Sequence, residues 1–177
     1  MSKDGIIFFP NIPTEEIFTA PHKYKVNGKM VASKPLIYAE NIIESLVLYF
    51  FKDGEIVDYS ASTGQDIFKS LLNVDEGSRY LGEIALVSSS SPFSQTNTLF
   101  YNTMFDENTG CHIGIGNANP SNIQGVGTTT EEELEEVGMN VSFQLTNVTF
   151  GTSDMEVVGI KEDNTKVVII KNGDFQI

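Results

Sequence analysis

The sequence is short of cysteine, histidine and basic residues, and each shortage excludes a class of protein. Its 177 residues include one cysteine, Cys111, which excludes an internal disulfide and a cysteine-based zinc knuckle. Eleven basic residues against 24 acidic ones give a net charge of −13, so we expect no nucleic-acid partner and no anionic membrane surface. The charge permits a cationic partner or a metal, although solubility alone is the interpretation we favour.

Long apolar runs are also missing, so no segment has the length that spans a membrane. Residues 1–5 show no basic stretch leading into an apolar one, which is the pattern of a secretory signal. We therefore expect a cytoplasmic protein. A hydrophobic content of 40% is typical of a globular chain, and this length suits one domain with a sizeable core.

Strand patterns dominate the chain. Residues 46–60 contain two apolar, β-branched and aromatic runs joined at Asp53-Gly54, which predicts a hairpin. Asn27-Gly28 predicts a tighter turn between two further strands. The other strands are expected at residues 24–26, 29–32, 82–87 and 141–150, with a C-terminal hairpin over 156–161 and 166–171.

Helix patterns are few and short. An apolar stripe over 67–72 follows Thr63, which we expect to be the N-cap of a helix. Thr130 with Glu133 forms a capping box that opens an acidic helix ending near Gly138. These patterns predict a single α+β domain over residues 1–177, built mainly of antiparallel sheet with a few short helices.

Few residues are available for catalysis or metal binding. Imidazole and carboxylate both suit divalent metals, but the chain has two histidines, His22 and His112. From its spacing alone, His112 is best interpreted as a structural histidine. Glu83 opens an apolar strand, where a metal or cation would stabilise it if it were buried; an exposed strand-end carboxylate explains it equally well. Glu16, with its neighbour Glu15, fits a solvated turn.

Three segments together resemble the aminopeptidase T/aminopeptidase S family of two-metal exopeptidases. They are residues 13–21, 80–87 and 100–112, and they are similar, in order, to the three metal-ligand segments of that family. Ser91-Pro92 and the C-terminal end match as well, so the similarity covers nearly the whole chain. Several motifs in the same order are far more specific than any one of them.

The resemblance implies a role for each matched residue. Glu16 would be the first carboxylate ligand, with Glu15 as the alternative. Glu83 would be the second carboxylate, acting as ligand or as general base, and His112 would be the first histidine ligand. The resemblance also implies that the chain corresponds to the catalytic, C-terminal domain of the family and lacks its N-terminal α/β domain.

Three positions depart from the family pattern. Asn119 stands in the place of a tyrosine that could hydrogen-bond a developing oxyanion. Leu145 and Asn147 stand where the family has its last two ligands, a histidine and an aspartate. Leucine cannot bind a metal and would instead pack in a core, and asparagine offers a neutral carbonyl oxygen.

These departures leave at most two carboxylates and one imidazole, too few for two neighbouring divalent cations. We therefore expect no metal, or one weakly bound zinc or cobalt ion held by Glu16, Glu83 and His112. Our first hypothesis is a degenerate aminopeptidase-like domain that binds a peptide or assembles with a protein partner. The second is a single-metal hydrolase.

A third hypothesis has a second chain complete the site. The resemblance implies a homodimer or association with a longer relative. Phe8, Phe9 and Ile12 are candidates for the surface involved.

Overall fold

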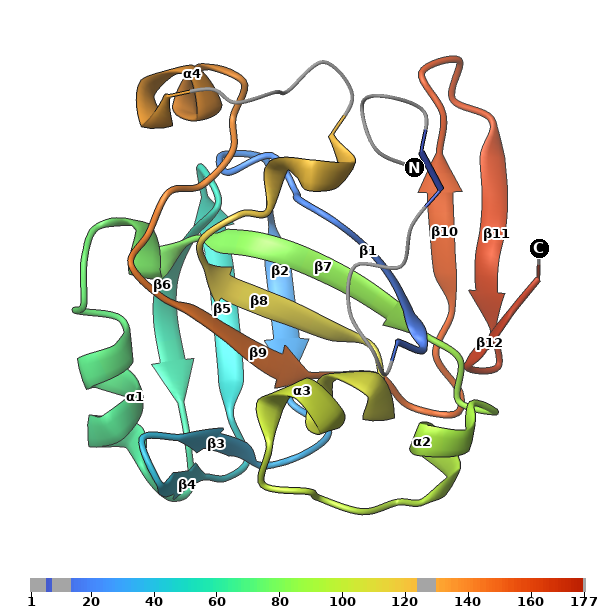
Figure 1. The fold of residues 1–177 in the computed structure, drawn as a ribbon, viewed down its shortest axis with the longest axis horizontal. Coiled ribbons are helices and arrows are strands. Elements are labelled where there is room, and N and C mark those ends of the chain that lie inside the picture. Colours follow the sequence, from blue (N-terminus) through green and yellow to red (C-terminus); the bar gives the residue numbers. More distant parts are fainter. Residues whose placement is uncertain (1–5, 8–13, 124–129, 177) are drawn as a thin grey trace.

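A four-stranded antiparallel sheet forms the centre of the structure, with the strand order β1-β7-β8-β9 (Figure 1). The structure is a computed structural model, which describes residues 6–7, 14–123 and 130–176. The central strands are β1 (Glu16–Thr19), β7 (Leu81–Val87), β8 (His112–Gly116) and β9 (Leu145–Thr149). The α+β class with mainly antiparallel sheet is therefore as predicted.

Three smaller sheets surround the central one. The first contains β2 (Gly28–Val31), β5 (Val47–Lys52) and β6 (Glu55–Ser60), and the second pairs β3 (Leu36–Tyr38) with β4 (Asn41–Ile43). The third contains β10 (Val157–Ile160), β11 (Lys166–Lys171) and β12 (Asp174–Phe175), and its hairpin stands at one side of the molecule (Figure 1). The predicted hairpins at Asp53-Gly54 and at the C-terminus are both present.

The central sheet has one apolar and one polar face, because successive side chains of a strand point to opposite sides. Ile113, Ile115 and Val148 are buried in the core, together with side chains of β5, β6 and the helix α1 (Gln65–Leu71). On the opposite face the pairing aligns Glu83 with Gly114, and Gly114 with Asn147. This register gathers the polar residues on one face.

Short helices close the ends of the sheets. They are α2 (Pro92–Gln95), α3 (Thr103–Asp106), α4 (Glu131–Glu136) and the 3₁₀ turns η1 (Gly77–Arg79), η2 (Glu107–Thr109) and η3 (Pro120–Asn122). The capping box of α4 is confirmed, since Glu133 N donates to Thr130 Oγ1 at 3.3 Å and Thr130 N donates to Glu133 Oε2 at 2.9 Å. None of the described helices is long and apolar enough to cross a membrane.

Two local predictions are wrong. Gly64, not Thr63, is the N-cap of α1, because the chain enters the helix with a φ of 75° and the Thr63 hydroxyl donates to Glu44 instead. Residues 24–26 form no strand; a turn at residues 23–24 occupies the start of this segment. Lys23 N donates to the Gly138 carbonyl in that turn, and β2 pairs with β5 rather than with residues 24–26.

Asn140 ties three segments together at one end of the central sheet. Its side chain is 1% exposed, and its amide nitrogen donates to the carbonyls of Gly77 at 2.8 Å and Gly116 at 2.6 Å. Both acceptors belong to buried residues. Loss of the amide would leave the buried Gly116 carbonyl without this donor and the Gly77 carbonyl with only its bond from Tyr80 N.

We therefore expect Asn140→Ala to lower the free energy of unfolding by about 2–3 kcal/mol, because buried groups that lose their partner keep their desolvation cost. The measurement is urea unfolding followed by circular dichroism. Asn73→Ala is the control: its amide donates to a carbonyl on an exposed surface, so a change below about 0.5 kcal/mol is expected. Equal effects of the two substitutions would contradict this account.

Candidate metal centre

Three side chains from three neighbouring strands converge on the polar face of the central sheet. His112 Nε2 lies 3.1 Å from Glu16 Oε2 and 3.3 Å from Glu83 Oε1. The side chain of His112 is fully buried, and those of Glu16 and Glu83 are 4% and 11% exposed. One ligand atom of each residue lies within 4.8 Å of the other two, so the three could share one ion.

The strand register explains why these side chains meet. His112 is the first residue of β8 and pairs with Ala85 of β7. Glu83 lies two positions before Ala85 on β7, and Val87 lies two positions after it. Val87 in turn pairs with Glu16 of β1. Residues two apart on a strand share a face, so all these side chains point the same way. Ala85 has only a methyl group, which leaves space above it for the three longer side chains.

The second ring nitrogen of His112 is held by the backbone. Nδ1 lies 3.2 Å from the Gly110 carbonyl oxygen, which accepts its hydrogen. This contact directs Nε2 at the two carboxylates. Histidine ligands in proteins are commonly oriented in this way, with the far nitrogen donating to a carbonyl or carboxylate.

The centre holds more negative charge than its protein groups can neutralise. Burial disfavours charge on the His112 ring, but Glu16 and Glu83 outweigh burial and raise the pKa of His112 to about 10. Glu16 Oε2 and His112 Nε2 are both closed to solvent and face each other at 3.1 Å. Two carboxylates and an imidazole whose buried atoms face each other fit a divalent cation, with a position left open for water or substrate.

A third carboxylate adjoins the centre. Glu107 of η2 is half-buried, and burial first, then the charge of Glu16, raises its pKa to about 7. Asn147 Nδ2 donates to Glu107 Oε2 at 3.0 Å, while Asn147 Oδ1 is buried and has no hydrogen-bond partner in the described part of the chain. A Cβ on Gly114 would lie 2.8 Å from Glu83 Cβ and 3.0 Å from Asn147 Oδ1, so the absent side chain lets both approach.

Glu107 was not among the residues predicted from the sequence. The only signal for it was its place in the segment 100–112, five residues before His112, since an isolated turn carboxylate is normally solvated. Burial by η2 and β9, which come together only in the fold, gives Glu107 its unusual environment.

The other residues considered from the sequence lie outside the cluster. Glu15 uses its backbone N–H to donate to Asn108 Oδ1 at 2.6 Å, so Glu16 is the carboxylate at the centre. Asn119 is exposed and caps η3, accepting a hydrogen bond from Ser121 N at 3.0 Å. Leu145 is 43% exposed and does not pack in a core, because it opens β9 on the polar face opposite Gly116.

Comparisons with known proteins agree with this arrangement. The sequence pattern of the thermophilic metalloprotease family M29 matches residues 1–175. The chain is 44% identical to Aminopeptidase 2 of Geobacillus stearothermophilus over 174 residues, which is 98% of this chain and 42% of the relative. It is 46% identical to Aminopeptidase AmpS of Bacillus subtilis over 175 residues, which is 99% of this chain and 42% of the relative.

A solved structure shows the same fold. Wild-type AmpT from Thermus thermophilus matches with a TM-score of 0.86 and 36% identity, covering 95% of this chain and 41% of that one. Fold and sequence thus place the chain in a family of metallopeptidases. The chain belongs to the M29 family, which confirms its resemblance to aminopeptidases T and S, and it spans about 42% of the length of the relatives it matches. Divalent metal use is a property of this family, and Glu16, Glu83 and His112 form a possible site.

Metal binding should release a proton near neutral pH. A His112 pKa of about 10 means that the metal-free imidazole is protonated at pH 7, so a metal must displace that proton from Nε2. The affinity for Zn²⁺ should then rise with pH, by about tenfold per unit for one displaced proton, and level off above the raised pKa. Calorimetric titration at one pH, in buffers of different ionisation enthalpy, measures the number of protons released.

His22→Asn is the control for this experiment. His22 is exposed and accepts a hydrogen bond from Tyr24 N at 3.3 Å, so its loss should leave the released proton unchanged. His112→Gln should abolish both the release and most of the binding. Zinc binding that is independent of pH between 6 and 8 would contradict the assignment of the centre.

Proposed function

We propose that this chain is a degenerate metallo-aminopeptidase-like domain that holds at most one divalent cation and has little or no peptidase activity. Its role is then to bind a peptide or to assemble with a partner protein. One observation carries the proposal: two carboxylates and one imidazole meet at the centre, while the two further positions implied by the resemblance hold Leu145 and Asn147.

A second cation would lack anionic ligands. Two divalent ions a few ångströms apart repel each other strongly and need several carboxylates between them. Glu107 is the nearest further carboxylate, and the Asn147 amide already donates to it. The centre therefore suits one ion, which Asn147 Oδ1 could join as a neutral ligand.

A single-metal hydrolase is the second candidate, and Glu107 is the observation that favours it. A bound divalent metal would supply Lewis acidity and lower the pKa of coordinated water. Glu83 would accept a proton as the base, and Glu107 could exchange one near neutral pH. Asn119 caps η3 and cannot replace the tyrosine hydroxyl. Loss of one such hydrogen-bond donor to a developing oxyanion typically lowers the rate by about a hundredfold.

Partner and metal identity belong to the same proposal. We favour zinc or cobalt as the ion, a cytoplasmic location, and a second copy or a longer relative as the partner. Ile17 at the edge of the central sheet and Ile160 of β10 are exposed apolar side chains that suit such contacts. Phe8, Phe9 and Ile12 lie outside the described residues.

The proposal predicts one metal per chain at most and no robust turnover of leucine-type chromogenic substrates. Metal analysis of purified protein and calorimetric titration with Zn²⁺ or Co²⁺ give the stoichiometry, and an absorbance assay gives the activity. Two tight sites, or strong turnover that a chelator abolishes, would contradict the proposal. In that case Glu83→Gln should remove the activity, because both roles of Glu83 need a carboxylate.

Restoring the family pattern should create a second site. Leu145→His, Asn147→Asp and Asn119→Tyr together should raise zinc binding towards two ions per chain, since residues 145 and 147 share the polar face of β9. Because Leu145 is 43% exposed, histidine there should fold without the cost of a buried imidazole.

Phe143→His is the matched control, because Phe143 is 92% exposed and lies two residues before Leu145. It adds an imidazole to the same segment and should leave zinc binding unchanged. If the triple variant keeps its thermal midpoint but binds no more zinc than the parent, the correspondence of these positions to family ligands is wrong.

A further inference from the structure

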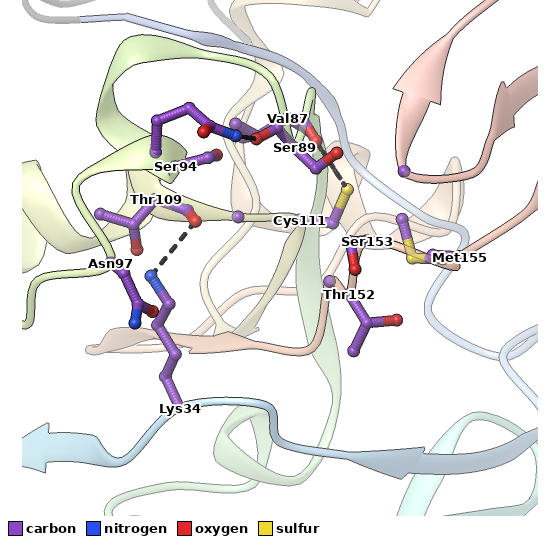
Figure 2. A pocket seen from close by; sticks show the side chains of 14 residues that line it. Lys34, Val87, Ser89, Ser94, Asn97, Thr109, Cys111, Thr152, Ser153 and Met155 are labelled. Atoms are coloured by element: carbon purple, nitrogen blue, oxygen red, sulfur yellow. Dashed lines mark hydrogen bonds between the residues drawn. The ribbon is translucent and has the colours of Figure 1, made fainter.

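A cavity lies behind the segment that leads into His112, and its charge differs from that of the chain as a whole. It measures about 310 Å³ and is bordered by the end of β7, by α2, by residues 109–111, by residues 151–153 and by Met155 (Figure 2). We name it the Lys34 cavity. None of the described residues that line it is an aspartate or a glutamate, although the chain carries 24 acidic residues.

Lys34 brings the positive charge to this cavity. Its side chain is half-buried, and Nζ donates to the Thr109 carbonyl at 3.2 Å. An ammonium has three hydrogens, so two remain for other acceptors. In the part of the chain that the structure describes, no carboxylate lies within ion-pairing distance of Lys34 Nζ.

Asp106 is the acidic residue that acts on Lys34, but its carboxylate is occupied by the backbone. It accepts hydrogen bonds from Phe100 N at 2.7 Å and from Asn102 N at 3.0 Å. Burial lowers the pKa of the Lys34 amine, and the charge of Asp106 offsets this only in part. A buried cation that is incompletely neutralised is stabilised by an anion placed against it.

The remaining walls offer neutral hydrogen-bonding groups. Figure 2 shows Lys34 and Asn97 on one side of the cavity, and the hydroxyls of Thr152 and Ser153 on the other. The volume is at the lower end of that of small-molecule sites, where a few polar groups orient the ligand. The hydroxyls of Thr152 and Ser89 already donate to Asp154 Oδ1 at 2.6 Å and to Asp174 Oδ1 at 3.2 Å, two carboxylates that are not part of the lining. The Asn97 amide and the Ser153 hydroxyl are the groups of these walls that can donate to a bound molecule.

We propose that the Lys34 cavity binds the carboxylate of a small molecule, or of a peptide end, that has no ammonium group beside it. The single positive charge of the Lys34 ammonium balances the single negative charge of a carboxylate. A phosphate carries nearly two negative charges and is bound better by arginine, whose guanidinium donates two parallel hydrogen bonds. A free amino acid would also bring an ammonium into a cavity whose described lining contains no carboxylate to receive it. This site is separate from the metal centre and stands whether or not a metal binds there.

The test is a calorimetric titration of the full chain with four probes. N-acetylglycine represents the carboxyl end of a peptide, and acetate represents a free small acid. Glycine carries an ammonium beside its carboxylate, and inorganic phosphate carries more negative charge than a carboxylate. We expect N-acetylglycine to bind with a Kd on the order of millimolar and glycine to bind about tenfold more weakly. Acetate as tight as N-acetylglycine would assign the site to free small acids, and weaker acetate would assign it to peptide ends.

Substitution of Lys34 separates the role of charge from that of shape. Lys34→Met should weaken N-acetylglycine binding by at least about tenfold, because it removes a charge-assisted hydrogen bond. Lys34→Arg should retain most of the affinity, and Lys69→Met, on the exposed side of α1, should have no effect. Thermal midpoints of all variants check that they fold.

Three results would overturn the proposal. The first is no saturable binding of either carboxylate by the parent chain at tens of millimolar. The second is unchanged affinity in a folded Lys34→Met variant. The third is phosphate or glycine binding more tightly than N-acetylglycine, which would assign the cavity to a different ligand chemistry.

Discussion

A surplus of buried negative charge governs the polar face of the central sheet. Glu16 and Glu83 both approach His112 Nε2 in a largely buried site, at 3.1 and 3.3 Å. Buried carboxylates need a cation or several donors. In the metal-free chain a proton on His112 meets this need, and a divalent metal would replace that proton. The Gly110 carbonyl holds the other side of the ring in either state.

Neighbouring residues link the centre to a third carboxylate, Glu107. Gly114 carries no side chain, which lets Asn147 and Glu83 approach each other across β8. Asn147 then donates to Glu107, so a neutral amide stands beside that carboxylate. A buried carboxylate with one such donor and a raised pKa can hold its own proton. The three strands of the centre thus present two carboxylates and one imidazole to one another.

Local patterns predicted those parts of the fold that depend on neighbouring residues. The Asp53-Gly54 hairpin and the capping box of Thr130 and Glu133 are both present, because each needs only contacts within a few residues. Residues 24–26 were wrongly expected to form a strand, since the Gly138 carbonyl, far along the chain, accepts from Lys23 N and fixes a turn there. The strands β3 and β4 were not expected, and three-residue strands offer little periodicity to detect.

In the candidate centre, too, the features that depend on residues far apart in the sequence could not be predicted from local patterns. Spacing alone favoured a structural role for His112, and only the order of several segments indicated a metal site. Glu107 was missed because its burial depends on β9, which follows it by about forty positions in the sequence. Leu145 was expected in a core because the face on which it would lie was unknown until the register of β8 and β9 was seen.

The central claim is that Glu16, Glu83 and His112 share a single cation. Anomalous diffraction from crystals grown with zinc, recorded on both sides of its absorption edge, tests this most directly. The account predicts one strong peak per chain, within bonding distance of His112 Nε2 and of a carboxylate oxygen of each glutamate. Two peaks at this centre, or a peak bound only elsewhere, would contradict it.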